Sequence, residues 1–439
     1  MTARVSIIAL FALIACVTPR PSDTTMPETT PDLDTIARSY VRLVLSMGLH
    51  DPDYVDAYYG PPEWRSQVEA DRPPLNEIRA RAAALVAELG RARPPEGAPD
   101  LIRLRHGYLA TQLEALIARA DILLGRKMSF DEQAEALYDA APPRHSEAEF
   151  REILERLDDR LPGEGPLPER VERFRRRFMI PADRLDRVFR AAIDGCRART
   201  VARIALPPSE TFRLEYVTGK SWSGYNWYQG GYQSLIQVNT ELPIFIDRAI
   251  DLACHEGYPG HHVYNVLLEK NLVRDRGWPE YSVYALFSPQ SLIAEGTANF
   301  GIEAAFPADE RLRFEKETLF PLAGLDPGTA EDYYEVLDLL DDLSYAGNEA
   351  ARRYMNGEAD AGQTAAWLSE FALYSPERAR QRVRFIDQYG AYVINYNLGK
   401  DLVRRHVEAL GGTPDRPERR WEVFEELLST PRLPSNLAR

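Results

Sequence analysis

Apolar residues recur at three- and four-residue intervals through most of this chain, which is the spacing of one buried helix face. In the N-terminal half the pattern predicts helices over residues 36–47, 78–89, 101–124 and 185–205. In the C-terminal half it predicts helices over residues 289–305, 308–322, 329–355, 376–387 and 391–409. We therefore expect a mainly α-helical protein.

One segment, residues 212–238, departs from the helical pattern. Phe212, Leu214 and Tyr216 alternate with polar residues, and glycines follow at positions 224, 230 and 231. Alternation of this kind, interrupted by glycine, is typical of short strands joined by turns. The apolar pattern becomes helical again after Pro243. We therefore expect a small β-sheet or hairpin directly before the helix that follows.

The composition is that of a soluble globular chain, since 44% of the 439 residues are hydrophobic and 27% are charged. This length is enough for one large domain or two ordinary ones. The formal net charge of −14 argues against nucleic acid as a partner, because phosphate binding needs concentrated Lys and Arg. Nothing in the sequence determines the oligomeric state.

The first sixteen residues differ from the rest of the chain. Arg4 precedes an apolar run over residues 5–15 that is too short to span a bilayer, and the run ends in Leu13-Ile14-Ala15-Cys16. This ending resembles the bacterial lipobox, so residues 1–16 are predicted to be a lipoprotein signal peptide with Cys16 as the lipidated residue. The alternative is a conventional signal peptide with a chance cysteine. Residues 17–32, rich in Pro, Thr and Asp, are expected to form a flexible tether.

These features predict an exported protein that its lipid holds at the periplasmic face of a bacterial membrane, the outer membrane in preference to the inner. We expect no other contact with the membrane. Beyond the tether the sequence predicts an N-terminal helical region over residues 33–205 and a metal-site region over residues 206–439. The two regions are expected to be continuous.

Only two cysteines, Cys196 and Cys254, remain after Cys16. Two cysteines in a chain of this length do not make a disulfide framework. Cys254 directly precedes a histidine, but adjacent residues on a helix point about 100° apart. We therefore expect Cys254 to be a small buried apolar residue rather than a metal ligand.

Three of the seven histidines lie within eight residues of one another, in a segment where Glu256 follows the first of them. The segment reads His255-Glu256-Gly257-Tyr258-Pro259-Gly260-His261-His262. Neutral imidazoles bind Zn²⁺ in hydrolytic enzymes, and a neighbouring carboxylate that is not a ligand takes the proton from the attacking water. The residue types in this segment therefore indicate a zinc hydrolase.

The spacing of the histidines does not suit an undistorted helix. His261 follows His255 by six positions, which corresponds to about 240° of rotation on a helix. His262 follows by seven positions and would lie about 10 Å from His255 along the helix axis. Pro259 cannot donate a backbone hydrogen bond, and Gly260 can adopt backbone angles that other residues avoid. We expect a break at these residues that restores His261 as the second ligand. His262 is the alternative second ligand.

A catalytic zinc site needs a third protein ligand, and Glu295 is the candidate. It follows the apolar residues 292–294, and small residues follow it, so it is expected on a buried face that another helix can approach closely. Asn299 and Glu303 lie one and two turns further on, where they could orient the ligands. The alternative is that Glu295 caps or salt-bridges a helix start.

The motif of residues 255–262, followed forty residues later by Glu295-Gly296, resembles the bacterial family known as domain of unknown function 885. Two further stretches fit this family, Val238-Asn239-Thr240 and Tyr396-Asn397-Leu398-Gly399, whereas Thr297 stands where an aromatic residue is usual. The resemblance extends to the zinc metallopeptidases whose third ligand is glutamate, such as carboxypeptidase Taq. It implies a multi-helical zinc-peptidase-like fold and one Zn²⁺ per chain.

The predicted reaction is hydrolysis of a peptide bond, with Glu256 as general base. The resemblance implies that Tyr396 donates a hydrogen bond to the oxyanion, with Tyr389 and Tyr392 as alternatives; each could equally be a core aromatic. The glycine-rich segment 221–233 could align substrate as an added strand, or it could be an ordinary hairpin. Lys220, Arg352 and Arg353 are candidates for binding a terminal carboxylate, and the spacing selects none of them.

Two other functions agree with the same residues. The chain could hydrolyse a non-peptide amide or an ester, because the same ligands activate water for any of these bonds. It could also be a lipoprotein that binds metal or peptide without turnover. The carboxylate of Glu256 argues against the second, because a binding protein has no need of it.

Overall fold

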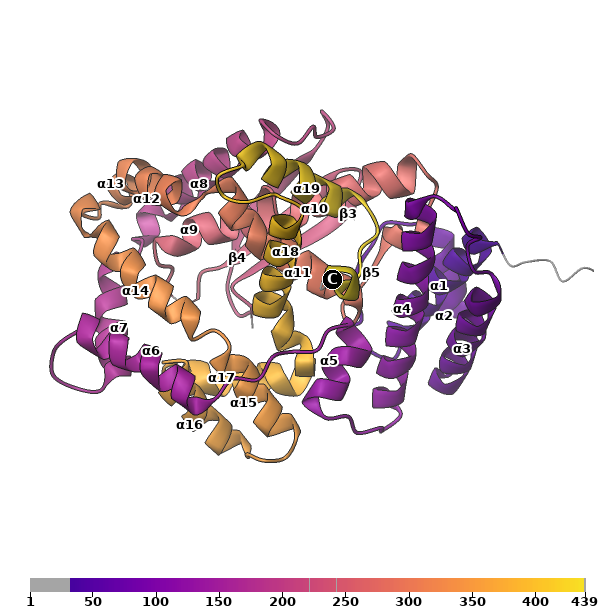
Figure 1. Ribbon diagram of the computed structural model, residues 1–439, viewed down its shortest axis with the longest axis horizontal. Coiled ribbons are helices and arrows are strands. Elements are labelled where there is room, and N and C mark those ends of the chain that lie inside the picture. Colours follow the sequence, from indigo (N-terminus) through magenta and orange to yellow (C-terminus); the bar gives the residue numbers. More distant parts are fainter. Residues whose placement is uncertain (1–31, 221, 242, 438–439) are drawn as a thin grey trace, which may run out of the picture. The chain divides into compact units, whose positions relative to one another are not determined.

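The computed structural model describes residues 32–437, apart from residues 221 and 242 (Figure 1). The predicted signal peptide, the lipidated Cys16 and nearly all of the tether lie outside these residues. From residue 31 onward the chain clusters as a single unit. The division into regions 33–205 and 206–439 stays a prediction.

Helices dominate the described residues, which confirms the predicted fold class. The N-terminal part contains α1 (Leu33–Met47), α2 (Pro62–Asp71), α3 (Leu75–Arg91), α4 (Asp100–Leu123), α5 (Phe130–Tyr138), α6 (Glu147–Arg160), α7 (Leu167–Arg175) and α8 (Leu185–Val201). The C-terminal part contains α9 (Asp247–Leu252), α10 (His261–Leu268), α11 (Pro289–Ala305), α12 (Ala308–Phe314), α13 (Phe320–Ala323), α14 (Ala330–Asp342), α15 (Ala346–Met355), α16 (Ala361–Phe371), α17 (Pro376–Tyr389), α18 (Ile394–Ala409), α19 (Pro417–Ser429) and α20 (Pro434–Leu437).

Five short strands form two small sheets in the part of the chain that the structure describes. The three-stranded sheet has the order β2-β4-β3, in which β2 (Thr211–Val217) pairs parallel and β3 (Gly224–Gly230) antiparallel with β4 (Gln233–Asn239). The hairpin between β3 and β4 is tight, because Gly230, Gly231 and Tyr232 all have positive φ angles. This sheet lies where the sequence predicts it. The pairing of β1 (Val55–Tyr58) with β5 (Val283–Ala285) has no counterpart in the prediction.

The most extensive contact between described helices is that of α11 with α18, in the middle of the helical array (Figure 1). The two helices cross at Gly296 and Gly399, where a Cβ on Gly296 would lie 2.9 Å from the Cα of Gly399. Small residues at the crossing allow the two backbones to touch, as the flank of Glu295 predicts. Nearly every residue of α11 is buried. This crossing fixes the position of Glu295 relative to the tyrosines that precede and begin α18.

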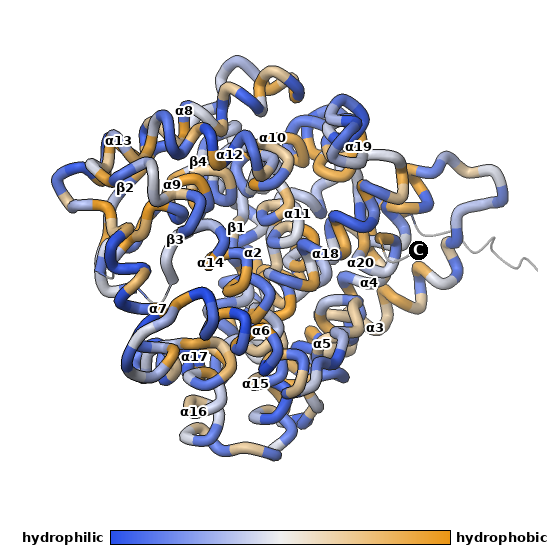
Figure 2. Tube along the Cα trace, turned by 60° about the vertical axis from the view of Figure 1, so that its left-hand side comes forward, coloured by the Kyte–Doolittle hydropathy of each residue, from blue (hydrophilic) through white to orange (hydrophobic). Residues whose placement is uncertain are grey.

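Helices at the periphery bury only one face. Figure 2 shows hydrophilic and apolar stretches alternating along α7 and α17, for example. Among the described residues, no helix combines the length and the apolar character needed to cross a bilayer.

A disulfide joins Cys196 on α8 to Cys254, and both side chains are fully buried. The sequence interpretation of Cys254 as a small apolar residue was right about its burial and missed this bond. The bond ties the segment that carries His255 to α8. It also removes Cys254 from the set of possible metal ligands.

Candidate metal centre

The backbone between α9 and α10 breaks where the sequence predicts it. Helix α9 continues into one π-helical turn, η3 (Ala253–Gly257), after which the peptide bond before Pro259 is cis and α10 begins at His261. The amide of Gly260 donates to the carbonyl of Cys254 at 2.9 Å. A Cβ at residue 260 would overlap the carbonyl oxygen of His255, so only glycine fits here.

This break brings the two imidazoles together. Nε2 of His255 lies 3.1 Å from Nε2 of His261, with the ring planes almost perpendicular. Oε2 of Glu295 lies 3.3 Å from the first of these nitrogens and 3.7 Å from the second. The candidate ligand atoms of the three residues all lie within 4.8 Å of one another. Donor atoms of a tetrahedral zinc ion are separated by roughly 3.3 Å, so this spacing suits one shared cation.

The donor set fits a metal in its chemistry as well as in its geometry. Oε2 of Glu295 is buried and accepts no hydrogen bond from any described residue, whereas Oε1 accepts one from the hydroxyl of Tyr392 at 2.9 Å. A carboxylate oxygen held without a donor, beside two ring nitrogens, is what a cation would satisfy. Two imidazoles and one carboxylate are the ligands that zinc takes in hydrolases, with one position left open.

Electrostatics at the cluster point the same way. Burial lowers the pKa of His261, but the carboxylates of Glu295, Glu256 and Asp56 outweigh burial and raise this pKa to about 9. Burial acts to raise the pKa of Glu295, but the neighbouring imidazoles of His255 and His261 hold it well below its usual range. The donors thus lie in a negative field, which favours a divalent cation over the protons that it would replace.

A second layer of side chains orients the donors. Oδ1 of Asn299 lies 3.2 Å from Nδ1 of His255, and its amide nitrogen donates to the backbone carbonyl of Tyr396 at 3.2 Å. This is the orienting contact that the position of Asn299 predicts. Glu303 lies elsewhere, in an ion pair with Arg404 at 3.1 Å, so it does not reach the donors as predicted.

Glu256 lies beside the donors without being one of the three. It is 5% exposed, and its backbone carbonyl accepts a hydrogen bond from Asn226 on β3 at 2.6 Å. Its carboxylate adjoins Gly224, where a Cβ would lie 2.8 Å from Oε1. The charge of Glu256 acts on His261 and on Tyr396. A carboxylate in this position can exchange a proton with a group bound at the cluster.

Tyr392, in the turn directly before α18, and Tyr396, in the first turn of α18, lie near Glu295. Tyr392 is the hydrogen-bond donor to Glu295, and its ring meets Tyr396 edge-on at 5.9 Å. Burial, followed by the charge of Glu295, raises the pKa of Tyr396 well above its usual value, so its phenol stays protonated at neutral pH. No described residue accepts a hydrogen bond from this hydroxyl, which leaves it available to a substrate.

His262 does not join the cluster. Its Nδ1 lies 2.8 Å from Oγ of Ser234, and its Nε2 lies 3.0 Å from Oε2 of Glu210. Burial lowers the pKa of His262, and the ring is completely enclosed. Both ring nitrogens are therefore engaged away from Glu295, and the structure does not bring His262, the alternative second ligand, to the cluster. The residue instead fastens α10 to the three-stranded sheet.

One residue near the cluster, Asp56, has no counterpart in the sequence interpretation. Asp56 on β1 accepts a hydrogen bond from the hydroxyl of Tyr225 on β3 at 3.2 Å. Burial, reinforced by the charges of Glu295 and Glu256, raises the pKa of Asp56 to about 6. The one available signal is a lone acid within the apolar and aromatic residues 54–59, which is unusual in a short strand.

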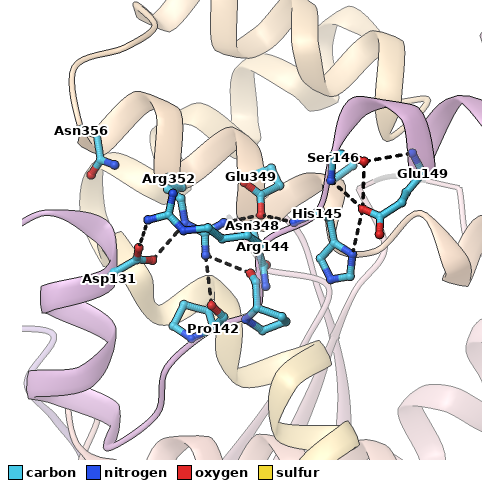
Figure 3. A network of polar contacts seen from close by, with 12 residues as sticks. Asp131, Pro142, Arg144, His145, Ser146, Glu149, Asn348, Glu349, Arg352 and Asn356 are labelled. Atoms are coloured by element: carbon cyan, nitrogen blue, oxygen red, sulfur yellow. Dashed lines mark hydrogen bonds and ion pairs between the residues drawn. The ribbon is translucent and has the colours of Figure 1, made fainter.

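The three cationic side chains considered for a terminal carboxylate lie apart from the cluster. Arg352 is held by Asp131 at 2.9 Å, by Glu349 and by the carbonyl of Pro143 at 3.0 Å (Figure 3). Arg353 lies over the ring of Trp367 at 4.3 Å. Lys220 is exposed. Arg352 joins α15 to α5 and has no free donor fork for a substrate.

Comparison with known proteins gives likeness of fold alone. No family model matches the chain, and no curated protein matches it. Among solved structures, the "putative lipoprotein" from Colwellia psychrerythraea is 15% identical, with 83% of this chain and 68% of that chain covered and a TM-score of 0.51. The protein called CHT is 12% identical, with 90% of each chain covered and a TM-score of 0.45. The M32 carboxypeptidase from Deinococcus radiodurans R1 is 14% identical, with 91% and 94% covered and a TM-score of 0.35.

Of these three, the first alone reaches the similarity at which a shared fold follows. The resemblance to the domain of unknown function 885 stays a prediction, because no family model matches. The chemistry of this chain therefore has to be argued from its own residues.

Proposed function

We propose that this chain is a zinc-dependent metallohydrolase and that its substrates are peptides. One observation carries the proposal: His255, His261 and Glu295 present three ligand atoms to one point, with the carboxylate of Glu256 beside them. A structural zinc site would normally use a fourth protein ligand, and this group of three leaves a position open.

When bound, zinc would polarise a carbonyl group and make a water molecule acidic near neutral pH. Glu256 would take the proton from that water as it attacks the carbonyl carbon, and would then give it to the departing amine. Tyr396 would donate its phenolic hydrogen to the oxygen that gains negative charge. Asn299 and Tyr392 would keep His255 and Glu295 in the required orientation.

The neighbouring sheet supports a peptide as the substrate. β3 lies at an edge of the three-stranded sheet, and its first residue, Gly224, adjoins the carboxylate of Glu256. An extended peptide can add to such an edge through main-chain hydrogen bonds. A substrate aligned on β3 would therefore pass beside the proposed general base.

Export as a lipoprotein through Cys16 is part of the same proposal. The disulfide between Cys196 and Cys254 supports it, because disulfides persist in oxidising compartments such as the periplasm. We propose the outer membrane as the site of anchoring.

The decisive experiment replaces Glu256 by Gln and measures both zinc content and cleavage of a mixed peptide library by mass spectrometry. We expect the variant to keep one zinc ion per chain and to lose at least about 100-fold in turnover, because the proton acceptor is gone. His261→Ala is the matched control, which should lose zinc as well as turnover.

Three outcomes would contradict the proposal. Turnover that survives in Glu256→Gln would exclude its role as general base. A wild-type protein that binds no zinc would exclude the metal centre. A protein that binds zinc but cleaves no peptide would be a binding protein or a hydrolase of another amide or ester.

A further inference from the structure

Four arginines from three helices form a group around Arg378. They are Arg175 at the end of α7, Arg248 on α9, and Arg378 and Arg382 one turn apart on α17. Desolvation lowers the pKa of Arg378, the charge of Tyr374 raises it, and the charges of the other three arginines lower it further. Arg378 is thus close enough to each of the other three arginines to be repelled by it. Arg378 nonetheless keeps contact with solvent, as a ligand-binding group must.

Nearby carboxylates neutralise only part of this charge. Arg175 faces Asp247 at 3.9 Å, and Arg248 faces Asp251 at 3.2 Å. Asp251 is shared, since Arg311 also lies 2.9 Å from it.

Within the part of the chain that the structure describes, no carboxylate lies at ion-pair distance from Arg378 or Arg382. Nε of Arg175 and Nε of Arg382 are buried without a hydrogen-bond partner there. Arg378 and Arg382 lie over the rings of Tyr374 and Phe385 at 4.3 and 4.6 Å. Their two positive charges therefore have no carboxylate counterpart among the described residues, in a chain whose net charge is −14.

Tyr374 contributes to the same arrangement. The guanidinium of Arg378 lies 4.3 Å from the centre of its ring, and burial, which acts to raise the pKa of Tyr374, is outweighed by the charges of Arg378, Arg382 and Arg175, which lower it. This effect on the phenol agrees with a positive field at this place. An anion that entered would be attracted by all four arginines.

The arginines connect to the metal donors from both sides. On one side α9, which carries Arg248, continues into η3 with His255, and Arg248 donates to Oγ of Ser223 just before β3 at 3.3 Å. On the other side α17 leads through η8 (Gly390–Val393) into α18, and the charge of Arg382 acts on Tyr396. A molecule bound by the arginines would therefore extend toward the proposed catalytic groups.

We propose that Arg175, Arg248, Arg378 and Arg382 form an anion subsite that binds the acidic end of the substrate peptide. The inference rests on the proposed peptidase function. Guanidinium groups bind carboxylates through paired hydrogen bonds, and two unneutralised arginines suit two carboxylates. The preferred substrate is therefore a peptide whose last residue is acidic, so that it offers its terminal carboxylate and a side-chain carboxylate together.

The test uses the full-length zinc-loaded protein and four peptides that differ only at the carboxyl end. The last residue is Glu or Gln, and the terminus is free or amidated, which separates the two sources of carboxylate. We expect kcat/KM to fall roughly tenfold for each carboxylate removed, mainly through KM, because one charge-assisted interaction is lost each time.

The variant Arg378→Gln/Arg382→Gln should abolish this ranking, so that the four peptides are cleaved with similar kcat/KM. The single variant Arg382→Lys keeps the positive charge and should therefore retain most of the preference for peptides with an acidic end. Arg384→Gln, an exposed arginine on the same helix, is the matched control and should leave the ranking intact. Zinc content and circular dichroism of each variant check that the fold is preserved.

The outcomes separate this inference from the function on which it rests. If the wild-type protein cleaves all four peptides equally well, the anion subsite is refuted and the peptidase stands. If the double variant keeps the ranking, residues other than Arg378 and Arg382 bind the carboxylates and the proposed subsite is refuted. If no peptide is cleaved, the proposed function itself has failed.

Discussion

An imidazole has two nitrogens, and the one that faces a metal is determined by what the other one binds. Asn299 lies 3.2 Å from Nδ1 of His255, which favours the tautomer with Nε2 free for coordination. The amide of Asn299 is in turn oriented by the backbone carbonyl of Tyr396. The orientation of the His255 ring toward the proposed metal therefore depends on the side chain of Asn299 from α11 and on the backbone carbonyl of Tyr396 from α18.

Replacing Asn299 by Ala should weaken zinc binding by about 10- to 100-fold, because His255 loses the contact that holds its ring and tautomer. Competition with a chromogenic chelator would measure the affinity. Asn271→Ala, in the helical segment that follows α10, is a control that should leave the affinity unchanged. An Asn299 variant with wild-type affinity would show that packing alone orients the ring.

At the scale of residues, much of the candidate site could be predicted from local sequence. His255, His261 and Glu295 are marked by residue type and by the break at Gly260. Asp56 could not be predicted in the same way, because it reaches the cluster only through the pairing of β1 with β5. His262 shows that spacing along the sequence does not by itself identify a ligand. The direction in which its ring points is determined by Glu210 and Ser234, which lie in other parts of the fold.

At the scale of elements, the crossing of α11 and α18 holds the site together. Helices usually pack with their axes 8–10 Å apart, and direct backbone contact requires glycine on both sides. Gly296 and Gly399 meet in this way directly after Glu295 and three residues after Tyr396. The distance between the proposed third ligand and the proposed oxyanion donor is therefore controlled by two residues that lack a side chain.

The variant Gly296→Ala should destabilise the protein by about 1–3 kcal/mol, because the added Cβ overlaps the backbone of Gly399 and forces the helices apart. Urea unfolding would give the free energy of unfolding. Gly347→Ala on α15 is the matched control, since no atom lies within 4 Å of its Cβ position. Helix propensity predicts that this control is neutral or gains up to about 1 kcal/mol. Equal stability of the two variants would contradict the close crossing.

The helices could be predicted from the periodicity of apolar residues, but the positions at which they are interrupted could be predicted only in part. The predicted helix over residues 329–355 is two helices, α14 and α15, separated by a turn at residues 343–345, which contain neither Gly nor Pro. Strands β1 and β5 are too short for alternation to be recognised. The disulfide escaped prediction because its cysteines are 58 residues apart, and only the tertiary fold brings them together.

At the scale of the whole molecule, buried charges join elements that are distant in sequence. Arg311 on α12 lies 2.9 Å from Asp251 on α9 and 3.0 Å from Glu315. Glu315 is completely buried, and burial outweighs the nearby Arg311, raising the pKa of Glu315 to about 7. Its ordinary value is 4.5, so this carboxyl holds its proton more tightly in the folded state than in the unfolded chain.

This difference makes stability depend on pH in a definite direction. Below about pH 4.5 both states hold the proton, and as the pH rises toward 7 the unfolded chain releases it first, so the free energy of unfolding falls. Glu315→Gln removes this contribution, which is at most roughly 3 kcal/mol. The variant should therefore lose less stability than the wild type between about pH 4.5 and 7 in urea unfolding. Parallel curves for the two proteins would contradict the raised pKa.

The covalent bond beside His255 has a consequence for maturation. In a reducing cytoplasm Cys196 and Cys254 would remain thiols, and the turn that presents the first imidazole would lack its tie to α8. If the chain is exported as proposed, oxidation after translocation would complete the scaffold of the active centre outside the cytoplasm. The newly made protein would then be least able to capture zinc where cellular peptides are most abundant, and best able to do so in the compartment where the proposed function would be carried out.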